Sequence, residues 1–320
     1  MKKLLVVLLA IIVISGIQHE TVKAKTDKEA LKGTVILSGA WALYPMTVRW
    51  AEEFRKIHPE VRIDIAAGGA GKGMADCLAG IVDIGMVSRE IYPEEIKKGA
   101  WWVSVTKDAV VATINKKNPV GRKLLSKGAR RKDLMDVWVT GKVKKWGEIT
   151  GDEKFYRINV YTRSDACGAA GTWAKYLGKN QEDLLGIGVY GDPGLAEAVR
   201  NDVLGIGFNN INYVYDAKTK EQIDGIQVLP IDLNNNGQID NDENFYGNRD
   251  GLASAISSGK YPSPPARDLH FVSRGKPAEK VVLDFLKWVL TDGQKYVPES
   301  GYIKLPERKL REELKKLETE

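Results

Sequence analysis

Strand-like segments alternate with helix-like segments along most of this chain of 320 residues. Residues 34–37 and 61–67 carry the apolar pattern of strands, whereas residues 46–57 carry apolar side chains at helical spacing. Because strands that alternate with helices usually form parallel sheets covered by helices, we predict an α/β fold with mixed, mostly parallel sheets. Further strands are expected at 81–87, 110–114, 158–161, 205–208 and 226–231, and further helices at 74–79, 134–139, 169–177 and 281–290.

The composition is that of a folded globular chain. Hydrophobic residues make up 43% of the sequence and charged residues 28%, which excludes intrinsic disorder and a collagen-like chain. A length of 320 residues leaves room for two domains. The formal net charge of +6 is too small and too dispersed to indicate a nucleic-acid partner.

The N-terminus has the pattern of a secretion signal. An apolar run at residues 4–14 follows Lys2 and Lys3 and precedes the polar stretch 18–32. The run is shorter than the about 20 apolar residues that a membrane-spanning helix needs. We therefore expect residues 1–24 to be a signal peptide and the mature chain to be extracytoplasmic, whether secreted, periplasmic or at the cell surface. An uncleaved membrane anchor is the alternative.

Three segments lead from a strand through small residues into a helix: residues 38–45, 68–73 and 163–172. Small residues let backbone N–H groups approach a ligand closely. The N-terminus of a helix adds unpaired N–H donors and a partial positive charge, which together favour an anion. The sequence therefore predicts an anion-binding site, and the Walker and dinucleotide-binding glycine spacings are both missing from it.

These blocks resemble the solute-binding proteins of phosphate-type ABC transporters, a family with the periplasmic-binding-protein fold. The likeness lies in S-G-A-W-A-L-Y-P-M, G-G-A-G-K-G, V-D-I-G-M-V-S-R-E, D-V-W-V-T-G-K-V-K-K-W-G-E-I and R-S-D-A-C-G-A-A-G-T, and it extends from about residue 33 to 305. It implies a two-lobed fold of type II with a two-strand hinge. Lobe I is then expected at 33–110 plus 272–306 and lobe II at 111–271. Independently of the resemblance, the charged residues 307–320 predict a C-terminal helix that forms a solvated end.

The resemblance also implies a function. Such a protein captures inorganic phosphate between its lobes and delivers it to the permease of an ABC importer, as a monomer and without catalysis. The hinge crossings are expected at 110–114 and 269–272. The anion-binding residues that the resemblance implies are Trp41, Ala42, Leu43, Tyr44, Gly69, Ala70, Gly71, Ser88, Arg89, Arg163, Asp165, Cys167, Gly168 and Ala169.

Several of these positions depart from the pattern of the family's phosphate binders. Leu43 and Ala169 stand where Thr is usual, Ala70 and Cys167 where Ser is usual, and Arg89 where an Asp is expected. A carboxylate can accept the proton that phosphate carries near neutral pH, whereas sulfate, tungstate and molybdate carry none. Replacing that Asp by Arg weakens discrimination against these anions, so another tetrahedral oxyanion stays open as the ligand.

Other roles stay open as well. Asp165 and Asp83 remain as acceptors for a phosphate proton, although we expect Asp165 chiefly to orient Arg163. The backbone N–H of Tyr44 is expected to serve in place of the side chain missing at position 43. The Trp41 ring packs against the ligand, against the closing lobe or in the core, and the sequence does not choose among these.

The sequence gives little support to an enzyme. A phosphatase or a Cys-nucleophile enzyme would use Cys167, whose thiol pKa a helix N-terminus lowers. No general base or metal cluster accompanies this cysteine, and His58 and His270 have the contexts of structural residues. We expect Cys77 and Cys167 to be free, buried thiols. A disulfide between them would lock the cleft shut.

A second site is predicted at residues 232–243, which fit a 12-residue calcium loop. Gly237 occupies the sixth position, where the chain turns sharply. We expect a structural Ca²⁺ bound weakly, at roughly 10⁻⁴–10⁻³ M as in extracellular modules. An Asn-rich surface turn and an adhesion role built on this loop are the alternatives. The expected ligands are Asp232, Asn234, Asn236, Gln238 through its carbonyl, Asp240 and Glu243.

Overall fold

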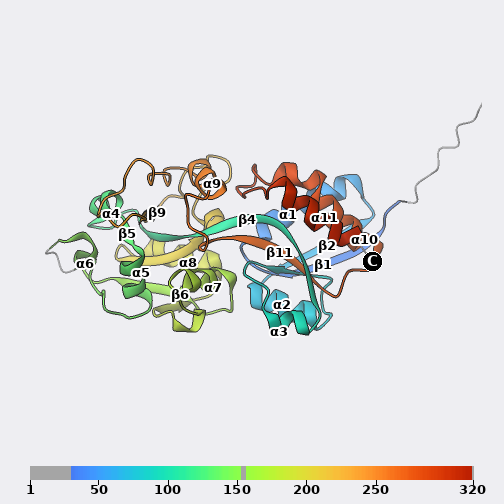
Figure 1. The fold of residues 1–320 in the computed structure, drawn as a ribbon, viewed down its shortest axis with the longest axis horizontal. Coiled ribbons are helices and arrows are strands. Elements are labelled where there is room, and N and C mark those ends of the chain that lie inside the picture. Colours follow the sequence, from blue (N-terminus) through green and yellow to red (C-terminus); the bar gives the residue numbers. More distant parts are fainter. Residues whose placement is uncertain (1–29, 153–155, 319–320) are drawn as a thin grey trace, which may run out of the picture. The chain divides into compact units, whose positions relative to one another are not determined.

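The computed structural model describes residues 30–152 and 156–318 (Figure 1). A sheet of nine strands has the order β2-β1-β3-β11-β4-β8-β6-β7, with β9 beside β4, and a second sheet joins β10 to β5. The strands are β1 (Gly33–Gly39), β2 (Val61–Ala67), β3 (Ile84–Val87), β4 (Ala100–Asn115), β5 (Ala129–Arg130), β6 (Asn159–Arg163), β7 (Ile187–Val189), β8 (Gly205–Asn210), β9 (Ile226–Val228), β10 (Ile231–Asp232) and β11 (Ala266–Arg274).

Eleven α-helices pack around these strands in the part of the chain that the structure describes. They are α1 (Tyr44–Ile57), α2 (Ala70–Leu78), α3 (Pro93–Lys97), α4 (Gly121–Lys127), α5 (Arg131–Trp138), α6 (Trp146–Thr150), α7 (Gly168–Tyr176), α8 (Gly191–Asn201), α9 (Arg249–Ser257), α10 (Lys280–Leu290) and α11 (Glu307–Glu318). Short 3-10 helices are η1 (Gln181–Asp183), η2 (Ile211–Tyr213) and η3 (Asp292–Tyr296). The predicted α/β class with mixed sheets is confirmed.

Strand directions explain how the two lobes are joined. β1 is parallel to β2 and β3, and β6 is parallel to β7 and β8, whereas β11 is antiparallel to β3 and β4. The long strand β4 pairs with β11 from Ala100 to Ala109 and then with β8 from Val110 to Ile114. The strands β4 and β11 therefore run side by side between the lobes (Figure 1).

The buried apolar residues form two cores. The core of lobe I draws on residues 35–105 and 269–317, and the core of lobe II draws on 109–266 together with Ile303. The chain thus crosses from one lobe to the other a few residues before each of the predicted boundaries, at 110 and 271. They fall there because β4 and β11 pair with each other up to the Ala109–Ala266 register and diverge beyond it.

Two local predictions need correction. The helix expected at 74–79 begins at Ala70, because the small residues of the second glycine-rich segment are themselves helical. The C-terminal helix, expected to be a solvated end, packs on lobe I. Its Leu310 and Leu317 are buried, Lys309 pairs with Asp268 of β11, and Lys316 lies over Trp102 of β4.

Within the described residues, we find no helix that is both long enough and apolar enough to span a membrane. The predicted signal peptide at residues 1–24 lies outside the described part of the chain. So do residues 319–320 of the predicted C-terminal helix.

Candidate anion-binding site

The first two of the three predicted segments, residues 38–45 and 68–73, lie side by side at one edge of the sheet. Because β1, β2 and β3 are parallel neighbours, their carboxyl ends meet there. Gly68 and Gly69 both donate their N–H groups to the carbonyl of Gly39, at 2.9 and 3.0 Å. Gly39 has φ +133°, and a Cβ there would lie 2.3 Å from the carbonyl oxygen of Met86. Only glycine permits this close packing.

Loops of the two lobes contact each other at this edge. The N–H of Gly71 in lobe I donates to the carbonyl of Ala166 in lobe II at 3.0 Å. Gly168, at the start of α7, lies so close to Ser88 that a Cβ would be 2.2 Å from the Ser88 carbonyl oxygen. The structure therefore brings the three predicted segments together with the lobes closed.

Several backbone N–H groups at this junction remain unpaired. Donors with no hydrogen-bond partner among the described residues include the N–H groups of Trp41, Ala42, Ala70, Gly168 and Ala169. They come from all three segments, and the last three lie in the first turn of α2 or α7. Unpaired N–H groups at helix N-termini are the donors that bind oxyanions in many proteins.

The N–H groups of Leu43 and Tyr44 are not free, contrary to the prediction. Both donate to the carbonyl of Ala40, at 3.0 and 3.1 Å, because the chain turns tightly into α1 at this point. Trp41 and Ala42 supply the free N–H groups of this segment instead.

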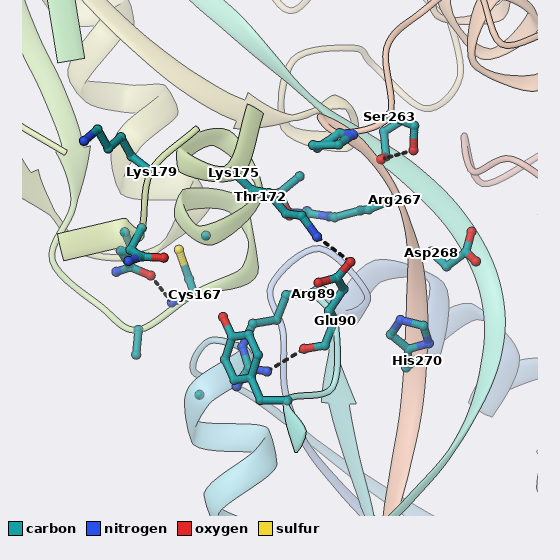
Figure 2. A pocket seen from close by; sticks show the side chains of 18 of the residues that line it. Arg89, Glu90, Cys167, Thr172, Lys175, Lys179, Ser263, Arg267, Asp268 and His270 are labelled. Atoms are coloured by element: carbon teal, nitrogen blue, oxygen red, sulfur yellow. Dashed lines mark hydrogen bonds and ion pairs between the residues drawn. The ribbon is translucent and has the colours of Figure 1, made fainter. Parts of the chain in front are cut away.

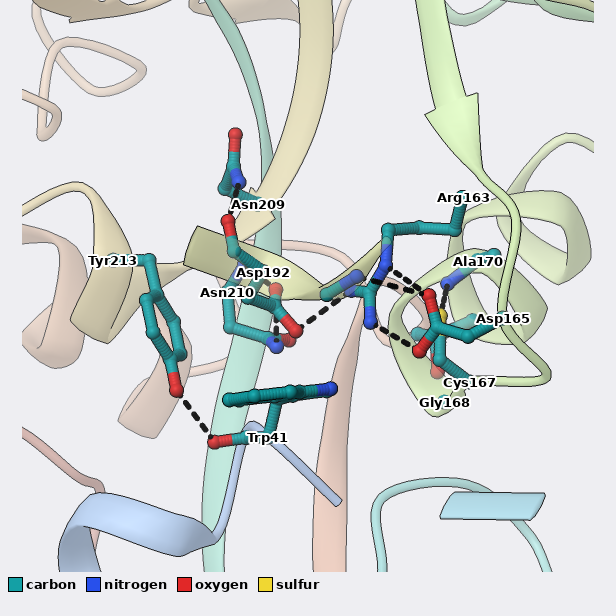
Figure 3. A network of polar contacts seen from close by, with 12 residues as sticks. Trp41, Arg163, Asp165, Cys167, Gly168, Ala170, Asp192, Asn209, Asn210 and Tyr213 are labelled. Carbon is teal, nitrogen blue, oxygen red and sulfur yellow. Dashed lines mark hydrogen bonds and ion pairs between the residues drawn. The ribbon is translucent and has the colours of Figure 1, made fainter. Parts of the chain in front are cut away.

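Arg163 is held by two buried carboxylates (Figure 3). Its Nε and Nη2 donate to Asp165 at 2.8 and 2.6 Å, and its Nη1 donates to Asp192 at 2.7 Å. Burial disfavours the charged guanidinium, but the neighbouring Asp192 and Asp165 carboxylates outweigh this and raise the pKa of Arg163. Asp165 thus orients the guanidinium, as expected from the sequence.

Asp83, the other proposed proton acceptor, lies elsewhere. Asp83 comes just before β3, and its Oδ2 accepts the N–H of Ile36 at 2.8 Å. Ser88 follows the opposite end of that strand. Arg89 is engaged within its own loop. Its guanidinium is paired with Glu95 at 2.7 Å and stacks over the Tyr92 ring. Position 89 therefore contributes neither an acceptor nor a free positive charge.

A polar chain that was not predicted from the sequence continues from Asp192 to the hinge. Asn210 of β8 donates from Nδ2 to Asp192 at 2.7 Å, and its amide oxygen accepts from Arg267 of β11. Arg267 in turn pairs with Asp108 of β4 at 3.0 Å. These partners are distant in sequence, so no local motif indicates them.

A family model described as "PBP superfamily domain" matches residues 24–293. The chain belongs to the PBP superfamily. "Phosphate-binding protein PstS" of Bacillus subtilis is 26% identical over 301 residues, covering 92% of this chain and 90% of that protein. The protein of the same name from Methanocaldococcus jannaschii is 27% identical over 335 residues, covering 86% of this chain and 83% of that protein.

Solved structures share the fold of this PBP-superfamily chain. A Clostridium perfringens protein, named as a phosphate ABC transporter substrate-binding protein with bound phosphate, matches with a TM-score of 0.70 at 22% identity. The match covers 86% of this chain and 100% of that chain. An ABC-type phosphate transport receptor of Vibrio cholerae matches with a TM-score of 0.62 at 18% identity, covering 85% of this chain and 100% of that chain.

A cavity of about 900 Å³ lies between the lobes of this PBP-superfamily chain (Figure 2). Gly71, Ala166 and Cys167 line one part of it, and the hinge residues Arg267 and His270 line another. Its charged lining residues are Arg89, Lys107, Lys175, Lys179 and Arg267, against Glu90, Glu182 and Asp268. Four of these cations are paired with carboxylates: Arg89 with Glu95, Lys107 with Asp268, Lys175 with Glu90 and Arg267 with Asp108.

The cysteines are free and buried, as predicted. Burial raises the pKa of the Cys167 thiol to about 12, and the positive charge of Arg163 only partly offsets this. Burial likewise raises the pKa of Cys77 to about 11. A lowered pKa at Cys167, which the enzyme alternative requires, is therefore contradicted.

The predicted calcium loop folds back on itself. Gly237 has φ +84°, as the sharp turn at the sixth position requires. Asp232 accepts the N–H groups of Asn236 and Gly237 at 3.2 and 2.8 Å, and Glu243 accepts that of Asn234 at 3.0 Å. No group of three or more His, Cys, Asp or Glu side chains arranged for a metal ion occurs in the described ranges.

Proposed function

We propose that this protein captures inorganic phosphate between its two lobes. The observation that carries the proposal is the group of unpaired backbone N–H donors, among them those of Trp41, Ala42, Ala70, Gly168 and Ala169, which come from three segments of both lobes. A free backbone N–H can donate to an oxygen of a tetrahedral anion, and the start of α7 adds the partial positive charge of a helix N-terminus. The PstS relatives are named for phosphate binding, which supports the same ligand.

The donors come from both lobes, so the ligand engages all of them only when the lobes are closed. Binding and closure are therefore linked, as in other two-lobed binding proteins. The closed lobes also contact each other through the ion pair between Lys175 and Glu90. We infer that the closed form is the one an ABC permease receives, outside the cytoplasm, with no chemical change to the phosphate.

Selectivity for phosphate over other oxyanions depends on an acceptor for the phosphate proton. Arg163 pairs with both Asp165 and Asp192. Among the described residues, the Oδ2 atom of each carboxylate accepts only one hydrogen bond, so each Oδ2 keeps a lone pair for a further donor. A Cβ on Gly69, across the junction in lobe I, would lie 3.0 Å from Oδ2 of Asp165. We infer that Asp165, through the remaining lone pair of its Oδ2, accepts the phosphate proton in place of the carboxylate missing at position 89.

Isothermal titration of the purified chain with phosphate, sulfate, tungstate and molybdate tests the proposal. We expect saturable binding of one phosphate per chain, with weaker binding of the anions that carry no proton. Tighter binding of sulfate, tungstate or molybdate than of phosphate would identify that anion as the ligand instead. Absence of binding by all four would contradict the proposal, and turnover of p-nitrophenyl phosphate would favour an enzyme instead.

We further propose that residues 232–243 hold a structural Ca²⁺. The side chains of Asn234 and Asn236 both reach Oδ2 of Asp240, at 2.9 and 2.7 Å, so three of the expected ligands already converge. Asp232 and Glu243 are 2% and 3% exposed, which leaves two buried carboxylates that a cation would stabilise. The loop packs on lobe II through the N–H of Ile239, which donates to Ser126.

Thermal unfolding with Ca²⁺ and with a chelator tests this second proposal. We expect Ca²⁺ to raise the melting temperature of the wild-type chain, because it binds only the folded loop. The variant Glu243→Gln should lose this increase, whereas Asp242→Asn, which changes an exposed residue at a position without a ligand role, should keep it. Equal melting temperatures with and without Ca²⁺ in the wild type would contradict the site.

A further inference from the structure

Trp41 carries a buried hydrogen-bond donor that the protein itself does not satisfy. Its ring nitrogen, Nε1, is buried and has no hydrogen-bond partner in the described structure. A buried N–H without an acceptor is unfavourable and rare in folded proteins. An indole N–H can only donate, so the missing partner is an acceptor.

The ring lies at the junction of the lobes. Trp41 belongs to lobe I, but its carbonyl accepts the hydroxyl of Tyr213 from lobe II at 3.0 Å. Its ring meets the Tyr190 ring edge to face, with centroids 6.2 Å apart. A Cβ on Gly191 would lie 3.3 Å from the ring atom Cε2, which is bonded to Nε1. The closed lobes therefore hold the indole in one position.

The neighbouring carboxylates are engaged elsewhere. Asp192 accepts from Asn210 at Oδ1 and from Arg163 at Oδ2, and Asp165 accepts from Arg163 at both oxygens. In Figure 3 the nitrogen end of the Trp41 ring points toward the side on which Asp165 and Gly168 lie. The backbone N–H groups of Trp41 and Gly168, both unpaired, belong to the predicted anion site.

We propose that the indole N–H of Trp41 donates a hydrogen bond to an unprotonated oxygen of the bound anion. This inference rests on the proposed function and identifies a residue that determines the specificity of that site. The indole N–H takes the place of hydroxyl groups that the family's phosphate binders usually carry and that are missing here at positions 43, 70, 167 and 169. Because lobe II holds the ring, the hydrogen bond forms only in the closed protein and stabilises closure around the ligand.

The variant Trp41→Phe removes the N–H and keeps an aromatic ring. We expect its affinity for phosphate to fall by about 10- to 100-fold, as for loss of one hydrogen bond to a charged ligand. Trp288→Phe is the matched control, since Trp288 also has a buried, unpaired Nε1 but lies in the core of lobe I. This control should bind phosphate like the wild type, and circular dichroism checks that both variants fold.

A second readout separates hydrogen bonding from packing. The chain has eight tryptophans, and ¹⁵N-labelled indole groups give one NMR resonance each. Phosphate should shift one indole resonance strongly, and this resonance should be absent from Trp41→Phe. Equal phosphate affinity of Trp41→Phe and wild type overturns the inference, as does weaker binding without an indole shift. A wild-type chain that binds no phosphate would instead overturn the proposed function itself.

Discussion

Arg267 of β11 and Asp108 of β4 form a buried ion pair between the two strands that join the lobes, with Nε and Oδ1 3.0 Å apart. Arg267 also donates to the hydroxyl of Thr172, at 2.9 Å, and to the carbonyl of Gly168 at the start of α7. Burial raises the pKa of Asp108, although the positive charge of Arg267 opposes this. The hinge is thus connected directly to the helix that supplies two donors to the anion site.

Removing one member of this ion pair should destabilise the fold. We expect Arg267→Met to lower the free energy of unfolding by about 3–5 kcal/mol, because it leaves Asp108 buried without a partner. The double variant Asp108→Asn, Arg267→Met should lose less than the single variant. Urea denaturation measures both, and a double variant less stable than Arg267→Met would contradict this account.

The contact between Gly168 and Ser88 predicts a variant that folds but does not close. In Gly168→Ala the new Cβ would lie 2.2 Å from the Ser88 carbonyl oxygen of the opposite lobe. Alanine otherwise suits a helix better than glycine, so the melting temperature without ligand should not fall. We expect phosphate affinity to drop by at least about 10-fold, or 1.4 kcal/mol.

Gly171→Ala provides the control, one turn further along the same helix. A Cβ at Gly171 meets no atom within 4 Å. Titration calorimetry should therefore find its phosphate affinity close to that of the wild type. A similar loss in both variants would show that helix composition, rather than closure, determines the affinity.

His270 predicts a pH dependence of stability. Burial lowers the pKa of His270 from 6.5 to about 4 in the folded protein. Between these values the unfolded chain binds a proton that the folded chain does not bind, so stability is full above pH 6.5 and falls as the pH decreases toward 4. Urea denaturation across this range should show a smaller decrease in His270→Asn. An identical slope in both proteins would rule out His270 as the cause.

The thiols should react slowly while the protein is folded. Burial raises the pKa of Cys77 to about 11 and that of Cys167 to about 12, so almost no thiolate forms near neutral pH. We expect iodoacetamide to leave the native chain unmodified on a time scale that fully modifies the denatured chain. Mass spectrometry counts the adducts, and rapid labelling of Cys167 in the native chain would disagree with its burial.

Much of the fold follows from local sequence patterns. Strands such as Val61–Ala67 and the helix Lys280–Leu290 bury one face at a clear period, so their positions are predictable to within a few residues. The helix Gly191–Asn201 is missed because it opens with Gly-Asp-Pro-Gly, which is typical of a turn. The C-terminal helix did carry a signal, since Leu310 and Leu317 have the spacing of a buried face.

The site is predictable only where its residues are close in sequence. Arg163 and Asp165 are two positions apart, and the glycine-rich segments are visible as motifs. Asp108 and Arg267 are 159 positions apart and meet only because β4 and β11 pair. Arg89 pairs with a glutamate six residues away, in the first turn of α3, so its charge stays within its own loop.

The most direct test of the site is a backbone ¹H–¹⁵N NMR titration of the assigned chain with phosphate. We expect the largest shifts at the unpaired N–H groups of both lobes, namely those of Trp41, Ala42, Ala70, Gly168 and Ala169. Leu43 and Tyr44, whose N–H groups already bond to Ala40, should shift less. Shifts confined to one lobe, or centred away from these residues, would show that phosphate does not bind between the lobes at these donors.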